Sequence, residues 1–543
     1  GIHSRCQPAP KDMRAPPGFP LAGSGSTCQL DPYLLQTLGA PRLRRAQYWT
    51  HRWLGTGGCL LFVMWFVSGV VMMYVGYPNL TDEERLAGLA PVRFEQAVVT
   101  PTAALETLPQ AVRTQPPRRM ALEMQAGTDA QPVWRTVDAR GGRHAVSARD
   151  GRVLGPVDAA QAEAIARDFS AQPGARWAET LERDQWTVPQ GLNPLRPLHR
   201  IEVGDAAGTE LYVSSRTGEV VRDTTRAERF WNWLGAVPHW IYFTPLRADP
   251  PLWHDVVVWL SAACIVSAVT GIVIGILRLR LRRRFRSGAV TPYTGWMAWH
   301  HIAGLIGGFF VLTWIVSGWL SMNPNGWFQR GPADAAAMAR YTGAGASPFP
   351  WPPAVLPAGE GAVAPREALL MWFDGKPLLQ LRDAQARVQV VDAATGAPAA
   401  ITRDDIVRVA ARLRPGAATT QATLQTHEDF HWYGHHRTRV LPVWRLEFDD
   451  AARSWLYIDP ASGQVAGSND RNARLRRWLF NAAHSLDFPW LIQYRPAWDL
   501  VVWFLSIIGV VASASGVVIG WRRLRRKPQP SPVQRGLQGS RVS

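Results

Sequence analysis

Four long stretches of the chain are apolar on every side and contain no charged residue. They cover residues 53–75, 256–277, 302–322 and 500–521, and they are 23, 22, 21 and 22 residues long. A helix of about 20 apolar residues can cross a hydrocarbon core of ~30 Å. Buried helices of soluble proteins seldom remain apolar on all faces over this length. The pattern therefore predicts four transmembrane helices.

The two long segments between these stretches, roughly residues 76–252 and 323–497, carry shorter periodic patterns. Alternating polar and apolar residues and their neighbours predict strands at 200–203, 211–213, 445–448 and 456–458, with turns at Thr217-Gly218 and Ser462-Gly463. Helical spacing predicts helices over 158–168 and 402–413, and Thr402 is the expected N-cap of the second. Each segment is therefore expected to be a small α+β unit with an antiparallel sheet.

The two halves of the chain repeat each other at constant spacing. Six residues of the first apolar stretch recur 249 positions later: His51, Gly55, Gly58, Trp65, Ser68 and Gly69 correspond to His300, Gly304, Gly307, Trp314, Ser317 and Gly318. Other residues recur 245 positions later: Pro197, Arg200, Glu202, Leu211, Tyr212, Gly218, His239, Gly271 and Gly275 correspond to Pro442, Arg445, Glu447, Leu456, Tyr457, Gly463, His484, Gly516 and Gly520. The chain therefore consists of two copies of a helix, an outer segment and a second helix.

The net charge of +17 would suit a nucleic-acid-binding protein, but its distribution indicates a membrane protein. Basic residues cluster beside the spans, over 42–52, 278–286 and 522–527. Lysine and arginine accumulate on the cytoplasmic side of membrane proteins. Both termini are therefore expected in the cytoplasm, and the two long segments are expected outside the inner membrane of a bacterium. Membrane lipid is an expected partner, and nucleic acid is not.

This topology divides the chain into nine expected parts. They are a disordered cytoplasmic tail (1–45), transmembrane helix 1 (46–76), a first periplasmic domain (77–229), an interfacial segment with transmembrane helix 2 (230–278), a basic cytoplasmic loop (279–296), transmembrane helix 3 (297–322), a second periplasmic domain (323–474), an interfacial segment with transmembrane helix 4 (475–522) and a cytoplasmic tail (523–543).

The four cysteines exclude several kinds of cofactor. Cys6 and Cys28 lie in the N-terminal tail and Cys59 and Cys264 in the predicted spans, so the outer segments are expected to fold without disulfides. The chain has no Cys-x-x-Cys-His sequence, which argues against covalently attached haem. It also has no cysteine cluster that would hold zinc or an iron–sulfur centre.

Histidine is scarce, with 13 in the chain, yet several histidines lie at the ends of the predicted spans. His51 and His300 are expected at the cytoplasmic ends of spans one and three. His239 and His484 are expected just before spans two and four, on the outer side. Two facing neutral imidazoles can bind a haem iron from opposite sides, and ionisable residues in membranes are functional by default because they are costly to place there. The two layers therefore predict two b-type haems, with these four histidines as axial ligands of the iron.

Glycines beside the first pair of histidines support this interpretation. Gly55 and Gly58 share a helix face with His51, as Gly304 and Gly307 do with His300, and a bare glycine strip can accept a flat cofactor. Each feature alone has a simpler explanation. A single histidine at a membrane edge usually bonds to a carbonyl or headgroup, and glycines let membrane helices pack closely. Their joint recurrence in both halves favours the haem site.

Other histidines are weaker candidates. His301 is rotated by about 100° from His300 on a helix, so it is expected to point elsewhere, toward a propionate or headgroup, rather than to ligate iron. His254 corresponds to Asp499 in the other half and is either an alternative ligand on the outer side or an asymmetric residue on the substrate side. The second outer segment alone has a cluster of His427, His431, His435 and His436. A hydrogen-bonded loop is the main expectation there, and a docking surface for an iron chelate or its metal is the functional alternative.

These residues resemble the PepSY-associated transmembrane family of bacterial inner-membrane proteins. The resemblance rests on His51-Arg-Trp-Leu-Gly55 with Ser68-Gly69, His300-His-Ile-Ala-Gly304 with Ser317-Gly318, the paired Arg-x-Glu, Leu-Tyr and turn motifs, and His239 with His484, and it covers roughly residues 45–525. It implies two periplasmic PepSY domains, each a helix packed on an antiparallel sheet, and b-type haem in a four-helix bundle. It also implies a ferric-siderophore reductase. Asp499 and the single histidine-rich loop depart from the twofold pattern.

The expected fold is therefore a membrane protein with a four-transmembrane-helix bundle and two periplasmic α+β PepSY-like domains, internally duplicated. The expected function is a dihaem oxidoreductase that passes electrons across the inner membrane to a periplasmic ferric siderophore. Gly55-Thr-Gly-Gly58 has no preceding strand and is not a phosphate loop, so a quinol or a cytoplasmic reductase is the expected electron donor. The alternatives are a non-redox PepSY protein that binds or regulates a periplasmic peptidase, a transporter, and a cytochrome with another periplasmic acceptor.

Overall fold

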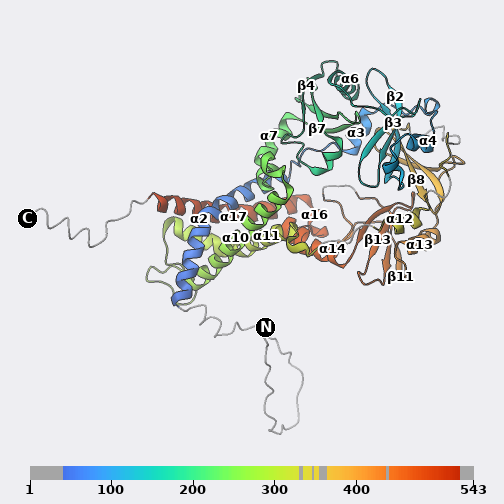
Figure 1. Cartoon of the computed structure of the whole chain (residues 1–543). Coiled ribbons are helices and arrows are strands. Elements are labelled where there is room, and N and C mark those ends of the chain that lie inside the picture. Colours follow the sequence, from blue (N-terminus) through green and yellow to red (C-terminus); the bar gives the residue numbers. More distant parts are fainter. Residues whose placement is uncertain (1–40, 329–333, 345–347, 354–363, 436–438, 526–543) are drawn as a thin grey trace, which may run out of the picture. The chain divides into compact units, whose positions relative to one another are not determined.

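Four long helices are the main elements of the computed structural model, which describes residues 41–328, 334–344, 348–353, 364–435 and 439–525. They are α2 (Pro41–Met72), α10 (Pro250–Arg278), α11 (Gly295–Ser321) and α17 (Arg495–Leu524). Within the described residues, these four helices are long and apolar enough to cross a membrane. The four predicted spans are thus confirmed as helices (Figure 1).

Two helices extend beyond the predicted boundaries at the ends of the chain. Helix α2 begins at Pro41, within the predicted N-terminal tail over 1–45. Likewise, α17 continues to Leu524, past the predicted end at residue 522. Proline is favoured in the first turn of a helix and arginine is a good helix former, so both helices extend beyond their uncharged stretch. The remaining parts of the predicted tails, 1–40 and 526–543, lie outside the described residues.

The four helices approach closely where one of them carries glycine. A Cβ atom added to Gly308 of α11 would lie 2.9 Å from Ile272 of α10, and one added to Gly509 of α17 would collide with Phe66 of α2. Small residues allow such close packing of membrane helices. In the centre, a cluster of buried apolar side chains joins all four helices: it contains Phe62, Phe66, Cys264 and Ile315, with Trp65, Trp314 and Val510 packed against it.

Each extramembrane segment contains a four-stranded antiparallel sheet, as the alternation predicts. The first has the order β4-β5-β6-β7 (Arg176–Leu181, Leu198–Glu202, Glu210–Ser214, Val220–Thr224), and the second the order β11-β12-β13-β14 (Thr419–Gln425, Val443–Phe448, Trp455–Ile458, Val465–Asn469). Helix α6 (Ala159–Ser170) packs on the first sheet and α13 (Arg403–Ala410) on the second. Asp158 and the predicted Thr402 cap these helices in capping boxes.

A third sheet joins the two segments, which the sequence patterns do not predict. Its order is β10-β9-β8-β1-β2-β3 (Val388–Asp392, Lys376–Arg382, Glu367–Phe373, Arg119–Gln125, Gln131–Val137, Arg143–Ser147). Strands β1 and β8 pair antiparallel at its centre, with Leu122 opposite Ala368. The two predicted periplasmic domains therefore share one continuous sheet. Its core includes Trp134, Phe349 and Leu379.

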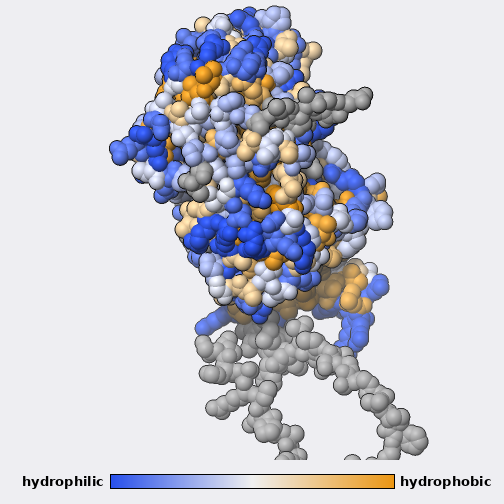
Figure 2. Space-filling view, turned by 90° about the vertical axis from the view of Figure 1, so that its right-hand side faces the viewer, coloured by the Kyte–Doolittle hydropathy of each residue, from blue (hydrophilic) through white to orange (hydrophobic). Residues whose placement is uncertain are grey.

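Short helices connect these parts. They are α3 (Asp82–Gly88), α4 (Pro101–Glu106), α5 (Gln110–Arg113), α7 (Arg226–Leu234), α8 (Ala236–His239), α9 (Thr244–Arg247), α12 (Ala335–Thr342), α14 (Arg471–Arg476), α15 (Ala483–Ser485), α16 (Pro489–Ile492), the 3-10 turns η1 (Phe94–Gln96), η2 (Gln190–Leu195), η3 (Pro324–Gly326) and η4 (Ala411–Leu413), and the π-helix η5 (Arg477–Ala482). Exposed Trp233 lies in α7 and exposed Trp478 lies in η5, and tryptophan is enriched at membrane–water interfaces. By contrast, hydrophilic side chains cover much of the molecular face in Figure 2.

Candidate functional site

The first candidate site is formed by His51 of α2 and His300 of α11. Their ring centroids lie 6.1 Å apart, with 33° between the ring planes. The Nδ1 atom of His51 donates to the carbonyl oxygen of Ser267 on α10 at 2.9 Å, and that of His300 donates to the carbonyl oxygen of Ala512 on α17 at 2.8 Å. Ser267 and Ala512 are 245 positions apart and are therefore equivalent in the two halves, so equivalent carbonyl groups orient the two rings.

Glycines on the neighbouring helices provide the space for these two rings. A Cβ atom at Gly271 of α10 would lie 2.6 Å from Cε1 of His51, and one at Gly516 of α17 would lie 3.1 Å from Cε1 of His300. The sequence shows Gly271 and Gly516 as repeated residues, but which helix lies against each histidine is visible only in the structure.

The second candidate site is formed by His239, at the end of α8, and His484 of α15. Their ring centroids lie 6.3 Å apart, with 71° between the ring planes. The Nδ1 atom of His239 lies 3.0 Å from Oγ of Ser68, and that of His484 lies 3.1 Å from Oγ of Ser317. Each ring also packs against a glycine of the same span, Gly69 or Gly318, where an added Cβ would lie 3.3 Å from Cε1.

Carbonyl oxygens fix the tautomer of three of the four rings, because a carbonyl can only accept a hydrogen bond. Nδ1 of His51 donates to Ser267, that of His300 to Ala512, and that of His484 to the carbonyl oxygen of Trp314 at 3.2 Å. Nδ1 of His239 instead contacts the hydroxyl group of Ser68, which lies 3.2 Å from the carbonyl oxygen of Trp65. Nδ1 thus carries the proton in His51, His300 and His484, and Nε2 carries the lone pair. In the described part of the chain no hydrogen bond reaches any of these four Nε2 atoms, which is the arrangement of histidines that ligate a metal.

The separation of the rings in both pairs suits two axial ligands of one haem iron. With metal–nitrogen distances of ~2.0 Å, two imidazoles on opposite sides of one ion have ring centroids roughly 6 Å apart. The observed 6.1 Å and 6.3 Å agree with this separation. Burial lowers the pKa of both His239 and His484, so these rings stay neutral and keep the lone pair that ligation needs. His51, His300, His239 and His484 therefore fit two bis-histidine haems.

Aromatic side chains occupy the space between the two sites. His51 and Ser68 lie 17 residues apart on α2, which corresponds to about 25 Å along a helix. Phe66 and Trp314 lie in this interval, with ring centroids 5.7 Å apart, and Phe310 lies 5.6 Å from Trp314. The interior between the histidine pairs is thus apolar and closely packed.

The predicted glycine strip is only partly open. An added Cβ at Gly304 would meet no atom within 4 Å, and those at Gly55 and Gly58 would make ordinary contacts of 3.7 Å with Ser267 and Cys264. Gly307 is different, because an added Cβ would lie 3.0 Å from Ile508. Its position therefore serves the packing of α11 on α17, while Gly55, Gly58 and Gly304 leave space near the first pair.

The structure does not bring His254 or His301 to either pair. His301 is buried, and its two ring nitrogens bond to Thr291 Oγ1 at 2.8 Å and to the Gly275 carbonyl at 2.9 Å. His254 bonds through Nε2 to the Met322 carbonyl at 3.0 Å, and its Nδ1 lies 3.2 Å from the carboxylate of Asp255. Both rings use both nitrogens within the protein, so neither presents a lone pair to a metal.

The histidine-rich segment is a hydrogen-bonded loop and not a helix, as expected. His435 contacts Asp487 at 2.7 Å and His427 contacts Thr426 at 2.8 Å, while the His431 ring packs on Trp455. His436 lies outside the described residues. Among those that are described, no three His, Cys, Asp or Glu side chains are grouped to hold a metal ion.

Replacing Gly271 by alanine tests whether haem binding requires the space that this glycine leaves for the His51 ring. The added methyl group would come within 2.6 Å of the imidazole, so the ring must turn away and bind metal less well. We expect haem content to fall at the first pair, measured per chain by absorption. Gly57→Ala is the matched control on α2, because its Cβ would meet nothing within 4 Å. Equal haem loss in both variants would contradict a specific role for Gly271.

The helices and sheets define the class of the protein: a multi-pass membrane protein with antiparallel α+β domains. Residues 48–397 match the family described as the PepSY-associated TM region. Because the match covers more than half of the chain, the protein belongs to the PepSY-associated transmembrane family, as its sequence motifs indicate. The matched range contains His51, His239 and His300 and ends before His484. No match was found among curated proteins.

Proposed function

We propose that the protein is a dihaem b-type cytochrome of the bacterial inner membrane that reduces ferric iron in a periplasmic siderophore. The observation that carries this proposal is the geometry of two histidine pairs, with ring centroids 6.1 Å and 6.3 Å apart and every Nδ1 atom hydrogen-bonded within the protein. Interfacial histidines that bond only to headgroups would have no reason to form two pairs with the same separation. Bound haem would supply reversible one-electron transfer.

The proposal also covers the orientation of the protein in the membrane and the origin of its two similar halves. Exposed arginines over 278–286 and 522–525 support cytoplasmic ends for α10 and α17. His51 and His300 then lie on the cytoplasmic side, and His239 and His484 on the periplasmic side with the extramembrane segments. The matched contacts at positions 245 or 249 apart support an internal duplication of the whole unit.

The protein residues hold and insulate the path between the two pairs. The four histidines are oriented by carbonyl and serine partners, and the apolar side chains around Phe66 and Trp314 exclude water between them. Electrons from a quinol or a cytoplasmic reductase would enter near His51 and leave near His484. Reduction to Fe(II) releases iron from a siderophore because hard oxygen donors bind the less charged ion more weakly.

An absorption spectrum before and after dithionite tests the proposal. Bis-histidine ligation is expected to give a sharp Soret band and, after reduction, a distinct α-band, with about two haems per chain. The sample is the full chain, purified in detergent from haem-replete cells. A colourless protein that is nevertheless fully inserted in the membrane would reject the cytochrome and favour the non-redox PepSY protein that binds or regulates a peptidase.

A further inference from the structure

Both four-stranded sheets carry a matching pair of arginines, one on the second strand and one in the following helix. In the first sheet these are Arg200 and Arg229, and 245 positions later they are Arg445 and Arg474. The carboxylate of Glu210 lies 3.3 Å from Arg200 and 3.4 Å from Arg229. One glutamate thus pairs with both arginines of the first sheet.

In the second sheet, tryptophan replaces that glutamate. Trp455 lies opposite Glu447 on β12, as Glu210 lies opposite Glu202 on β5. The guanidinium carbons of Arg445 and Arg474 lie 5.0 Å and 4.3 Å from the centroid of the indole. An indole attracts cations through its π face but carries no negative charge. The second sheet therefore keeps positive charge that the first sheet neutralises.

Arg474 is the less compensated of the two arginines. Arg445 still pairs with Asp429 at 2.9 Å and Glu447 at 3.1 Å. Arg474 donates instead to the carbonyl oxygens of Arg453 and Asn469, at 2.9 Å and 3.2 Å, and it forms no ion pair with a carboxylate in the described part of the chain. Burial accordingly lowers the pKa of Arg474.

A further arginine, Arg477, lies buried beneath this surface and is only 7% exposed. Its Nε donates to the carbonyl oxygen of Phe430 at 2.5 Å and its Nη2 donates to that of Asp487. Its guanidinium carbon lies 4.8 Å from the ring of Trp478. The ring of His431 lies between the two indoles, 5.3 Å from Trp455 and 6.2 Å from Trp478. Cationic and aromatic groups thus alternate across this surface.

This surface adjoins the second histidine pair. Trp478 lies in the π-helix η5, and His484 follows six residues later in α15. The ring of Phe480 lies between them in sequence and stacks on His484, with centroids 5.3 Å apart. A molecule bound against Trp478 would therefore be close to the proposed periplasmic haem.

We propose that the cluster of His431, Arg445, Trp455, Arg474 and Trp478, which overlies the buried Arg477, binds an anionic aromatic ferric chelate, of the catecholate class. The proposal rests on the reductase function proposed above and assigns its substrate to the second segment alone. Arginines match the anionic oxygens and indoles match the planar rings. One electron arriving near His484 converts bound Fe(III) to Fe(II) and makes the chelate one charge more negative, and no bond to the protein forms or breaks.

Binding of redox-inert gallium(III) tris-catecholate to the full chain tests the cluster independently of electron transfer. Arg474→Glu is expected to raise Kd about tenfold or more, because it replaces a hydrogen-bonding cation by an anion. Trp455→Glu places a carboxylate where the first sheet has Glu210, and it is expected to raise Kd by a similar factor. Isothermal titration calorimetry measures Kd. Neutral gallium(III) tris-acetohydroxamate is expected to bind at least tenfold more weakly than the catecholate.

Arg403→Glu is the matched control, because it makes the same change of charge on the second segment, at a side chain that is 56% exposed and pairs with exposed Asp404. It should leave Kd within about twofold. Equal weakening by Arg403→Glu, no effect of the two cluster variants, or equal binding of the neutral chelate would overturn the proposal. Haem content is read from the same samples. A colourless protein that binds the catecholate through the cluster would refute the reductase but not the binding site.

Discussion

Replacement of His484 by alanine is expected to remove one of two haems and to abolish reduction of ferric chelates. The change deletes one imidazole of the second pair, 6.3 Å from His239, and leaves the first pair untouched. Haem content should fall from about two to about one per chain, while the remaining haem keeps its bis-histidine spectrum. Absorption gives the haem content, and trapping of Fe(II) with a coloured chelator gives the rate of reduction.

Two further variants separate ligation from packing. Ser317→Ala keeps His484 and the bond from its Nδ1 to the Trp314 carbonyl, but removes the hydroxyl group 3.1 Å from Nδ1, and loss of such a partner commonly costs 10–100-fold in metal affinity. It should therefore have a smaller effect than His484→Ala. His301→Ala removes a buried histidine whose nitrogens both bond within the protein, and it should retain both haems. Haem loss in His301→Ala as large as in His484→Ala would contradict the assignment of ligands.

The local elements could be predicted because their signals are local. Long uncharged apolar stretches predict the spans, and alternating polar and apolar residues predict strands such as β5 and β12. The helix start at Thr402 follows from its capping box with Asp405. The helix ends at Pro41 and Leu524 were missed because charge, which ends the membrane-spanning stretch, does not end a helix.

Contacts between segments that are distant in the sequence could not be predicted from local patterns. Repetition marked His51, His300, His239 and His484 as a set, but periodicity does not show which helix lies against each ring. Helical spacing therefore pointed to glycines on the same helix as each histidine. In the structure, the ring of His51 packs against Gly271 of the neighbouring helix α10. Similarly, no local pattern pairs β1 with β8, since these strands come from opposite halves of the chain.

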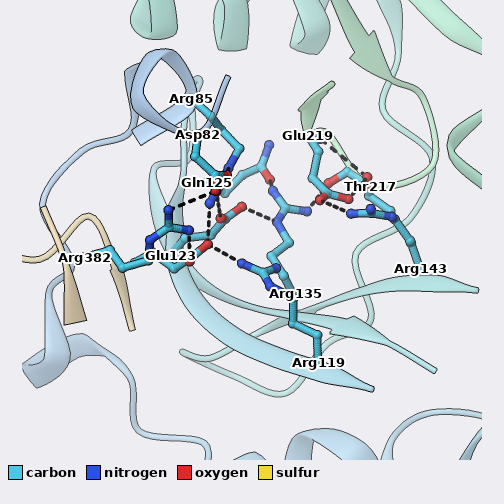
Figure 3. A network of polar contacts seen from close by, with 11 residues as sticks. Asp82, Arg85, Arg119, Glu123, Gln125, Arg135, Arg143, Thr217, Glu219 and Arg382 are labelled. Carbon is cyan, nitrogen blue, oxygen red and sulfur yellow. Dashed lines mark hydrogen bonds and ion pairs between the residues drawn. The ribbon is translucent and has the colours of Figure 1, made fainter. Parts of the chain in front are cut away.

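The six-stranded sheet places two carboxylates directly opposite each other at the junction of the halves. Glu123 of β1 pairs in register with Glu367 of β8, and like charges in such positions repel. Arg85 of α3 bridges them, at 3.1 Å from Glu123 and 2.6 Å from Glu367. Arg135 lies 2.7 Å from Glu123, and further contacts to Glu367 come from Arg119 and Arg382. Figure 3 shows the arginines converging on this junction.

Glu367→Gln is therefore expected to destabilise the shared sheet strongly. Glu367 is completely buried. Burial alone would raise its pKa, but the guanidinium groups of Arg119 and Arg85 outweigh burial and hold the pKa at about 2. Removing one partner of a buried ion pair typically costs 3–5 kcal/mol. Urea unfolding of the full chain in detergent, followed by tryptophan fluorescence, should show a loss of about 3 kcal/mol at pH 7, relative to the parent protein.

The pH dependence of the free energy of unfolding tests whether the negative charge of Glu367 causes this loss of stability. Because folding lowers the pKa of Glu367, its contribution is fully present above the unfolded pKa of about 4.3 and is lost as the pH falls through about 2. The parent protein should thus lose about 3 kcal/mol between pH 5 and pH 2 that Glu367→Gln does not lose. Asp82→Asn is the control, since Asp82 pairs with Arg382 at 2.9 Å but its side chain is 62% exposed, and exposed pairs contribute about 1 kcal/mol or less. If the free energy of unfolding depends on pH in the same way in the parent and in Glu367→Gln, the charge of Glu367 does not stabilise the shared sheet, and the packing of its side chain does.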